Sequence, residues 1–238
     1  MSYEAVLFDL DNTLYPYAPC NEAGKRAALS AFRERGYEID RERFDELYLT
    51  GRREAKRELR GTAASHDRFL YFKRAIRAHA GVHDAGDALA AGEAYWEGYM
   101  KRMEPFDGVE DVLTSIRESG AAVAVVTNLV TRVQLEKLDR LGFDEYVDRL
   151  VTSEEVGREK PSALPFTTAL AALDIAPSEA IMVGDNEIAD VEGANAVGID
   201  SVLFTGGTGD VPTTDELAES ERPDHRVDEF AALAEVVA

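Results

Sequence analysis

The chain has 238 residues, of which 45% are hydrophobic, and its 46 acidic and 26 basic side chains give a formal net charge of −20 at pH 7. This length is sufficient for one α/β domain with an insertion, or for two small domains in one chain. The acidic balance argues against nucleic acid as a partner, because phosphate backbones are bound through basic surface.

The first predicted element is a strand over residues 5–8, which read AVLF. Such an unbroken apolar run is typical of a strand buried on both faces of a parallel sheet. The run ends at Asp9-Leu10-Asp11. Ligands of open α/β sheets bind at the carboxyl ends of the strands, so two carboxylates at this place favour a chemical role.

The next stretch, up to Pro105, shows helical periodicity and no strand pattern. Residues 15–19 (YPYAP) contain two prolines, which restrict the backbone and remove donors, so we expect a hinge there. Predicted helices then begin after caps at Asn21, Asp40 and Ser65, and a last one runs from about Asp84 to Met103. An all-helical insertion of roughly ninety residues is too long for an ordinary loop. The sequence therefore predicts a cap domain at residues 16–104, inserted in a core of residues 1–15 and 105–238.

From Pro105 the pattern alternates between helices and short apolar strands. The predicted helices cover residues 109–119, 130–141, 162–173 and 188–197, with a final helix capped by Asp228. The predicted strands cover residues 122–126, 150–152, 180–183, 201–204 and 225–227. This alternation predicts an α/β fold with a Rossmann-like parallel sheet as its core. We interpret the polar segment 205–223 as a connection, because its GGTG sequence lacks the basic residue of a P-loop.

Three further polar signals occur along the core. They are Thr127-Asn128, Lys160-Pro161, and Gly184-Asp185 with Asp190 further on. Together with Asp9 and Asp11, in this order, they resemble the four motifs of the haloacid dehalogenase-like (HAD) superfamily: a DxDxT strand end, a Thr or Ser strand end, a Lys, and GDxxxxD. The resemblance extends from Ala5 to about Asp200. It implies a HAD-like core with a helical cap between the first and second motifs.

Asp9 and Asp11 are the candidate catalytic residues. A carboxylate can attack phosphorus and form an aspartyl-phosphate, which divides one difficult displacement into two easier ones, and we assign this role to Asp9. Asp11 is assigned to protonate the leaving oxygen and then to deprotonate the attacking water. The HAD resemblance implies the same roles for these two positions.

A phosphoryl group in transfer spreads negative charge over its oxygens, so its site must supply donors and positive charge. Thr127 offers a hydroxyl, Asn128 an amide or its backbone N–H, and Lys160 a cation. The resemblance implies that all three surround the phosphate.

Hard oxygen ligands for Mg²⁺ are expected from Asp9, the Asp11 carbonyl and Asp185. Without a cation, the carboxylates would repel one another and the incoming anion. Asp190 completes the GDxxxxD pattern, and we expect it to orient metal-bound water or Lys160.

The resemblance thus implies a Mg²⁺-dependent phosphatase for a small phosphate monoester, with phosphoglycolate, a triose phosphate or a nucleoside 5′-monophosphate as candidate substrates. A 2-haloacid dehalogenase is the near alternative, although dehalogenases of the family need no metal and lack an acid at the position of Asp11. A receiver-like phosphoacceptor module is a second alternative, although receivers are shorter and carry no helical insertion. A catalytically silent binding protein would show no Mg²⁺ binding at Asp185.

Charge is unevenly divided along the chain. Residues 21–80 carry 15 basic and 10 acidic side chains, a net of +5, so the remaining 11 basic and 36 acidic side chains give −25. Two explanations stay open: the positive cap docks on a negative core, or a few of its cations close over an anionic substrate. Arg52, Arg53 and Lys56 follow Gly51 at an expected bend between cap helices, and they are the candidate substrate contacts.

The remaining features concern the setting of the protein. The sequence has neither an apolar run of about 18 residues, as a membrane span requires, nor a secretory signal, so we expect a cytoplasmic protein without a membrane partner. The single Cys20 cannot form an internal disulfide and argues against a structural zinc site. Only six of the 26 basic residues are Lys, and with the acid excess we interpret this as a halophilic adaptation to a salty cytoplasm. A monomer and a homodimer both remain open.

Overall fold

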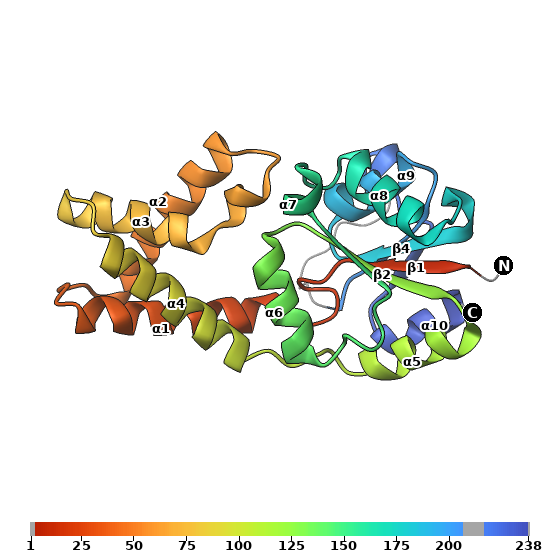
Figure 1. The fold of residues 1–238 in the computed structure, drawn as a ribbon, viewed down its shortest axis with the longest axis horizontal. Coiled ribbons are helices and arrows are strands. Elements are labelled where there is room, and N and C mark those ends of the chain that lie inside the picture. The colour runs from red at the N-terminus through yellow and green to blue at the C-terminus, as the bar shows by residue number, and fades with distance from the viewer. Residues whose placement is uncertain (1–2, 207–216, 238) are drawn as a thin grey trace. The chain divides into compact units, whose positions relative to one another are not determined.

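The computed structural model describes residues 3–206 and 217–237 of the chain. It divides into two compact units, an α/β unit of Met1–Tyr17 and Glu104–Ala238 and a helical unit of Ala18–Met103 (Figure 1). Within the described ranges, no helix combines the length and the apolar character that a membrane span requires.

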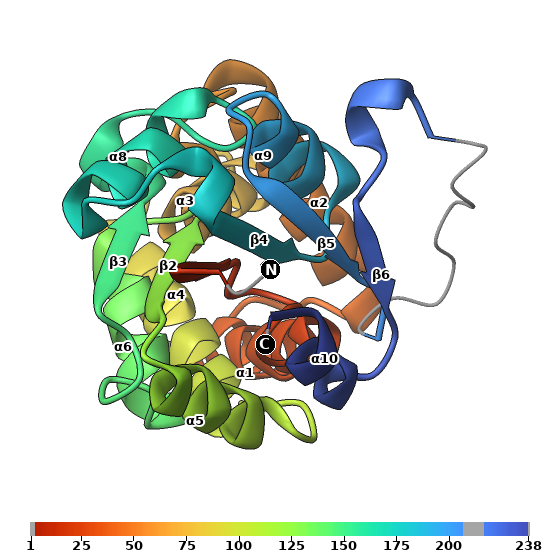
Figure 2. The same cartoon turned by 90° about the vertical axis from the view of Figure 1, so that its right-hand side faces the viewer.

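The α/β unit is built on a parallel sheet. Among the described residues its strands are β1 (Ala5–Phe8), β2 (Ala122–Thr127), β3 (Arg149–Thr152), β4 (Ala180–Gly184), β5 (Asp200–Phe204) and β6 (His225–Val227). They are ordered β3-β2-β1-β4-β5-β6, and all neighbouring strands pair in parallel (Figure 2). The predicted Rossmann-like sheet is therefore confirmed.

Helices cover both faces of this sheet. They are α5 (Val109–Ser119), α6 (Thr131–Leu141), α7 (Ser153–Val156), α8 (Ala163–Leu173), α9 (Gly193–Asn195) and α10 (Leu233–Val237). Figure 2 shows α5, α6 and α10 on one face and α8 and α9 on the other. Because both faces are covered, β1 is buried along its whole length, which explains its unbroken apolar sequence.

The strand order changes direction at β1. The chain adds β2 and β3 on one side of β1 and then β4 and β5 on the other. Open α/β sheets bind their ligands outside the carboxyl ends of the strands at such a switch point, which here falls between β1 and β4. Asp9 follows β1 and Asp185 follows β4, so the fold brings these two acids to the switch point.

The helical unit consists of α1 (Tyr17–Glu34), α2 (Arg41–Glu58), α3 (Arg68–Ala80) and α4 (Ala85–Lys101), with a short 3₁₀ turn at Ala63–His66. Its core is aromatic. Phe32 packs edge-on against Phe44 with ring centroids 5.4 Å apart, and Phe72 lies 5.8 Å from Tyr95. Pairs at such distances add stability beyond the area that they bury.

Two helix starts in this unit differ from the prediction. α1 begins at Tyr17 rather than after Asn21, so the predicted break at residues 15–19 ends earlier than expected. Pro19 lies in the first turn of α1, where a backbone N–H needs no partner within the helix. α3 is capped by Asp67, whose side chain accepts from Phe69 N, and not by Ser65. Asp40 caps α2 as predicted.

The predicted bend at Gly51 is also wrong. Gly51 is buried in the middle of α2, which continues to Glu58. A Cβ atom at this position would lie 2.5 Å from the carbonyl oxygen of Tyr71 on α3. The glycine therefore serves the close approach of α2 and α3.

Two later elements also depart from the prediction. The expected helix at residues 188–197 is a π-helical segment, η3 (Glu187–Glu192), followed by α9. The final helix begins as a 3₁₀ turn at Phe230–Ala232 that Asp228 does not cap. Most of the GGTG sequence, from residue 207 on, and the rest of the predicted connection up to residue 216 lie outside the described residues.

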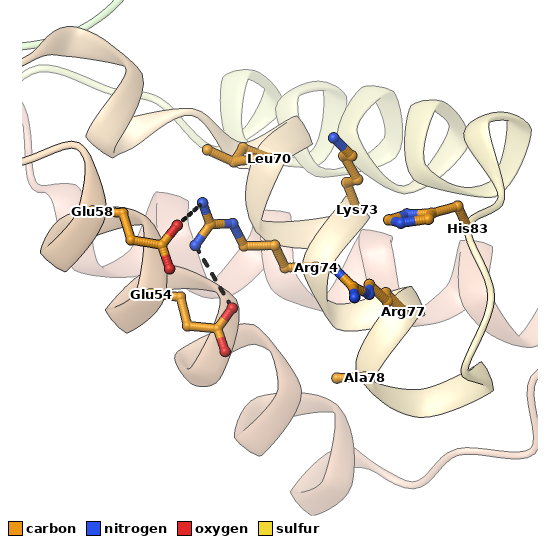
Figure 3. Close-up of a pocket in the computed structure, with 8 residues that line it drawn as sticks. All are labelled: Glu54, Glu58, Leu70, Lys73, Arg74, Arg77, Ala78 and His83. Carbon is orange, nitrogen blue, oxygen red and sulfur yellow. Dashed lines mark hydrogen bonds and ion pairs between the residues drawn. The ribbon is translucent and has the colours of Figure 1, made fainter.

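A cavity of about 560 Å³ lies on the helical unit between α2, α3 and the turn before α4 (Figure 3). Arg74 crosses it, donating to Glu58 over 2.8 Å and lying 3.6 Å from Glu54. These contacts join α3 to α2. Its described lining residues include none of the predicted site residues.

Candidate active site

The turn after β1 places Asp9 beside the end of β4. The backbone N–H of Asp9 donates to Val183 O over 2.9 Å, which continues the β1–β4 pairing. Asn12 adopts a left-handed backbone with φ of 68°, a conformation that Asn tolerates better than most residues. Its side-chain amide donates to Asp185 over 2.8 Å. The turn thus links the first and last motifs directly.

Lys160 lies at the centre of this arrangement. Its Nζ donates to Asp9 Oδ1 over 2.7 Å, to Asp190 Oδ1 over 2.6 Å and to Val126 O over 2.6 Å. An ammonium group has three donors, so all of them are used. The side chain is 1% exposed. The predicted motif residues Asp9, Lys160 and Asp190 therefore form one buried ion-pair network.

Asn128 holds the backbone of Lys160. Its Oδ1 accepts from Lys160 N over 2.8 Å, and its Nδ2 donates to Lys160 O over 3.1 Å. These two bonds fix the loop that carries the lysine. They also engage both ends of the side-chain amide, and we therefore favour the backbone N–H of Asn128 for the contact with phosphate.

Asp190 is brought to the site by a glycine and a π-helical turn. A Cβ atom on Gly184 would lie 2.3 Å from the carboxyl carbon of Asp190, so only glycine fits beside this side chain. The Asn186 N–H donates to Asp190 Oδ2 over 3.1 Å. π-Helical turns of this kind occur frequently at functional sites.

Asp11 has a separate set of partners. Lys137 Nζ donates to its two carboxylate oxygens over 2.6 and 2.7 Å, and the Tyr15 hydroxyl donates to one of them. Gln134 Nε2 donates to Asp11 over 3.1 Å and to Thr127 Oγ1 over 2.5 Å. Gln134 thus joins the first and second motifs through their side chains.

Sequence reasoning missed Lys137, Gln134 and Tyr15. A signal for two of them was available, because the buried face of α6 comprises Val133, Gln134, Lys137 and Leu138. Two polar residues on an otherwise apolar helical stripe indicate a buried polar contact. The helix pattern alone did not show what that contact is.

The carboxylates differ in their electrostatic surroundings. Burial raises the pKa of Asp9 to about 8 against the opposing charge of Lys160, and the nearby Asp190, Asp185 and Asp11 raise it further. Burial likewise raises the pKa of Asp185 to about 7. Burial would also raise the pKa of Asp11, but the charge and hydrogen bond of Lys137 outweigh it and hold that pKa well below its usual range.

The chemistry of the donor set fits a divalent cation. Carboxylate oxygens of Asp9, Asp185 and Asp190 lie within 4.8 Å of one another, and Lys160 contacts two of these acids, Asp9 and Asp190. Such hard oxygen ligands suit Mg²⁺. Both oxygens of Asp190 already accept hydrogen bonds, from Lys160 and Asn186. This supports Asp9 and Asp185, rather than Asp190, as the direct ligands of a metal ion.

The cap candidates lie on α2 of the helical unit. Arg52 and Arg53 are exposed. Lys56 Nζ lies 2.7 Å from Nε2 of His66, on the 3₁₀ turn that follows α2. Their contribution to substrate binding stays a prediction.

Comparison with known proteins gives concordant matches. The profile of the haloacid dehalogenase-like hydrolases matches residues 6–204. A ribulose-1,5-bisphosphate 5-phosphatase of Halopiger xanaduensis is 51% identical over 235 residues, 98% of each chain. A glyceraldehyde 3-phosphate phosphatase of Methanopyrus kandleri is 32% identical over 98% of this chain and 97% of its own. The structure of a HAD-hydrolase from Bacillus subtilis, bound to magnesium, superimposes with a TM-score of 0.74 at 18% identity, covering 100% of this chain and 99% of that chain, which shows the same fold.

Proposed function

Because the chain belongs to the haloacid dehalogenase-like hydrolases, we propose that it is a phosphatase that hydrolyses the monoester of a small phosphorylated sugar. The observation that carries this proposal is the junction of Asp9, Lys160 and Asp190 beside Asp185 at the carboxyl ends of β1 and β4. It joins a nucleophile, a cation and a cation-binding acid at the place where this fold binds ligands.

In the proposed first step, Asp9 attacks the phosphorus and the ester oxygen leaves. A covalent aspartyl-phosphate forms, and the P–O bond to the sugar breaks. Lys160 holds Asp9 in place and balances the charge that spreads over the transferred phosphoryl oxygens. We assign the Thr127 hydroxyl and the Asn128 N–H to the same oxygens.

In the second step, water hydrolyses the aspartyl-phosphate. Asp11 gives a proton to the leaving sugar oxygen in the first step and takes one from the attacking water in the second. Mg²⁺ held by Asp9, Asp185 and the Asp11 carbonyl would supply positive charge that lowers the repulsion between these acids and the phosphate.

The relatives direct the choice of substrate. Ribulose 1,5-bisphosphate and glyceraldehyde 3-phosphate are named for the phosphatases that align over nearly the whole chain, and both are phosphate esters of short sugars. We therefore place them ahead of phosphoglycolate and nucleoside 5′-monophosphates.

The test is phosphate release from these four substrates with Mg²⁺, with EDTA, and at low and high KCl. We expect turnover of a sugar phosphate that EDTA abolishes and Mg²⁺ restores. Halide release from a 2-haloacid without phosphate release would instead support the dehalogenase alternative.

Asp9→Asn should abolish turnover while the protein remains folded, because it removes the nucleophile and nearly preserves side-chain volume. We expect less than about a hundredth of the wild-type rate, the scale of a key catalytic group. The exposed Asp107 provides a matched control, and Asp107→Asn should keep full activity. A higher residual rate in Asp9→Asn would exclude Asp9 as the nucleophile.

A further proposal concerns the second charged group of a bisphosphate. If Arg52 and Arg53 bind it, their joint replacement by Gln should raise KM for ribulose 1,5-bisphosphate and not for p-nitrophenyl phosphate. Loss of a contact with a charged group costs about 1.5 to 3 kcal/mol, which is tenfold or more in KM. Arg43→Gln, on the same helix and paired with Glu46, is the control. Equal changes for both substrates would leave only a structural role for the two arginines.

A further inference from the structure

Lys137 is a buried cation in the α/β unit to which the hydrolysis scheme gives no role. Its side chain is 1% exposed, on the face of α6 that also carries Val133 and Leu138. Its Nζ reaches both oxygens of Asp11, over 2.6 and 2.7 Å, and lies 5.8 Å from the ring centre of Tyr15. A charge placed on an apolar helix face costs desolvation energy that only a good partner offsets.

Gln134 lies one helical turn before Lys137 and restrains the same carboxylate. Its Nε2 donates to both Asp11 and Thr127, while its Oε1 is buried without a hydrogen-bond partner in the described part of the chain. Leaving an acceptor unpaired is costly. The hydrogen bonds to Asp11 and Thr127 therefore set the orientation of the Gln134 side-chain amide.

Stability alone is a weak explanation of these contacts. Replacing a buried ion pair by apolar residues of similar size is often neutral or stabilising, so the presence of such a pair is poor support for a purely structural role. A carboxylate bonded by Lys137, Gln134 and Tyr15 has, by contrast, little freedom to rotate. A proton-transfer group needs this constraint, because it must lie within hydrogen-bond reach of the reacting oxygen.

We propose that Lys137 and Gln134 are positioning residues for the hydrolysis, which fix the Asp11 carboxylate in the orientation in which it takes a proton from the attacking water. This inference rests on the proposed function. Lys137 acts through Asp11 and does not contact the reacting atoms.

The experiment uses Lys137→Met, Asp11→Asn, and the double variant Asp11→Asn/Lys137→Met. The double variant removes both charges together, so it leaves no uncompensated ion. If Lys137 acts through Asp11, we expect Lys137→Met to reduce kcat on the sugar phosphate by about 10²-fold, the lower part of the range for proton-transfer groups. The double variant should then be as slow as Asp11→Asn alone.

Leaving-group dependence supplies a readout that a merely structural role would not change. p-Nitrophenolate leaves without help from an acid, so Lys137→Met should still form phosphoenzyme from p-nitrophenyl phosphate but hydrolyse it slowly. We expect a burst of p-nitrophenol equal to the enzyme concentration and a phosphate label on acid-quenched protein. Arg132→Met, an exposed change on the same helix, should behave as wild type.

Three results would overturn the proposal: a wild-type rate in Lys137→Met, equal losses on both substrates without a burst, or a double variant much slower than Asp11→Asn. If Lys137→Met does not fold, the comparison of the double variant with Asp11→Asn still decides the matter. A wild-type protein that releases no phosphate from any ester would reject the proposed function itself, which separates the two failures.

Discussion

Asp9 and Asp11 are two residues apart at the end of one strand, but their surroundings differ. Asp9 shares Lys160 with Asp190 and faces Asp185, so carboxylates outnumber the cation around it. Asp11 has Lys137 beside it and two neutral donors in addition. Distinct environments of this kind are how proteins give two carboxylates separate roles in one reaction.

Gly184→Ala should remove activity although position 184 contacts no substrate in the proposed scheme. The added Cβ would lie 2.3 Å from Asp190, which must then move away from Lys160. We expect a loss of at least about 10²-fold in kcat, the effect of removing a key group, together with a lower Tm. In Gly86→Ala the nearest atom is 3.4 Å away, so this control should change neither quantity much. Wild-type activity in Gly184→Ala would show that hydrolysis does not require the contact between Asp190 and Lys160.

At the scale of residues, the sequence pattern identified the site residues that directly follow strands. Asp9 and Asp185 directly follow apolar runs, and the carboxyl ends of parallel strands meet at one edge of the sheet. Lys137 and Gln134 belong to a helix, where the partner of a buried face depends on how the helix packs on the sheet. That register is a tertiary property, so the local pattern does not contain it.

At the scale of elements, the close packing of α2 against α3 depends on the absence of a side chain at Gly51. Gly51→Ala would place a Cβ atom 2.5 Å from the Tyr71 carbonyl oxygen and force the helices apart. We expect a loss of about 1 to 3 kcal/mol in the free energy of unfolding, as for other overpacked sites. Urea denaturation gives this value. Thr50→Ala, the exposed neighbour on α2, should change it little. Equal stability of the two variants would contradict the close packing.

The structural role of a glycine within an element could be predicted from the sequence only in part. Gly81 ends α3 with φ of 73°, and Gly120 ends α5 with φ of 88°. Gly51 serves packing instead, and so the predicted bend was wrong. A glycine works either through its backbone freedom or through its missing Cβ atom, and the sequence does not distinguish the two. The π-helical turn of η3 was missed because its spacing resembles an ordinary helix.

At the scale of the whole molecule, charge is the dominant feature. A net charge of −20 on 238 residues creates self-repulsion in the folded state, which salt screens. The Debye length falls from about 10 Å at 0.1 M salt to about 3 Å at 1 M. We therefore expect Tm to rise steeply between these KCl concentrations and to change far less with an uncharged osmolyte. A Tm that is insensitive to KCl would contradict the proposed adaptation to a salty cytoplasm.

The π-helical segment η3 limits which changes of sequence and length the chain tolerates between Asp185 and Asp190. In η3 the backbone oxygen of Asn186 accepts from both Asp190 and Val191, over 2.9 and 3.3 Å. This widened turn connects Asp185, which follows β4, with Asp190, which accepts from Lys160. Ile188, between them, is 51% exposed. The segment therefore acts as a spacer, and we expect a polar residue at position 188 to be tolerated far better than the insertion or deletion of a residue between the two acids.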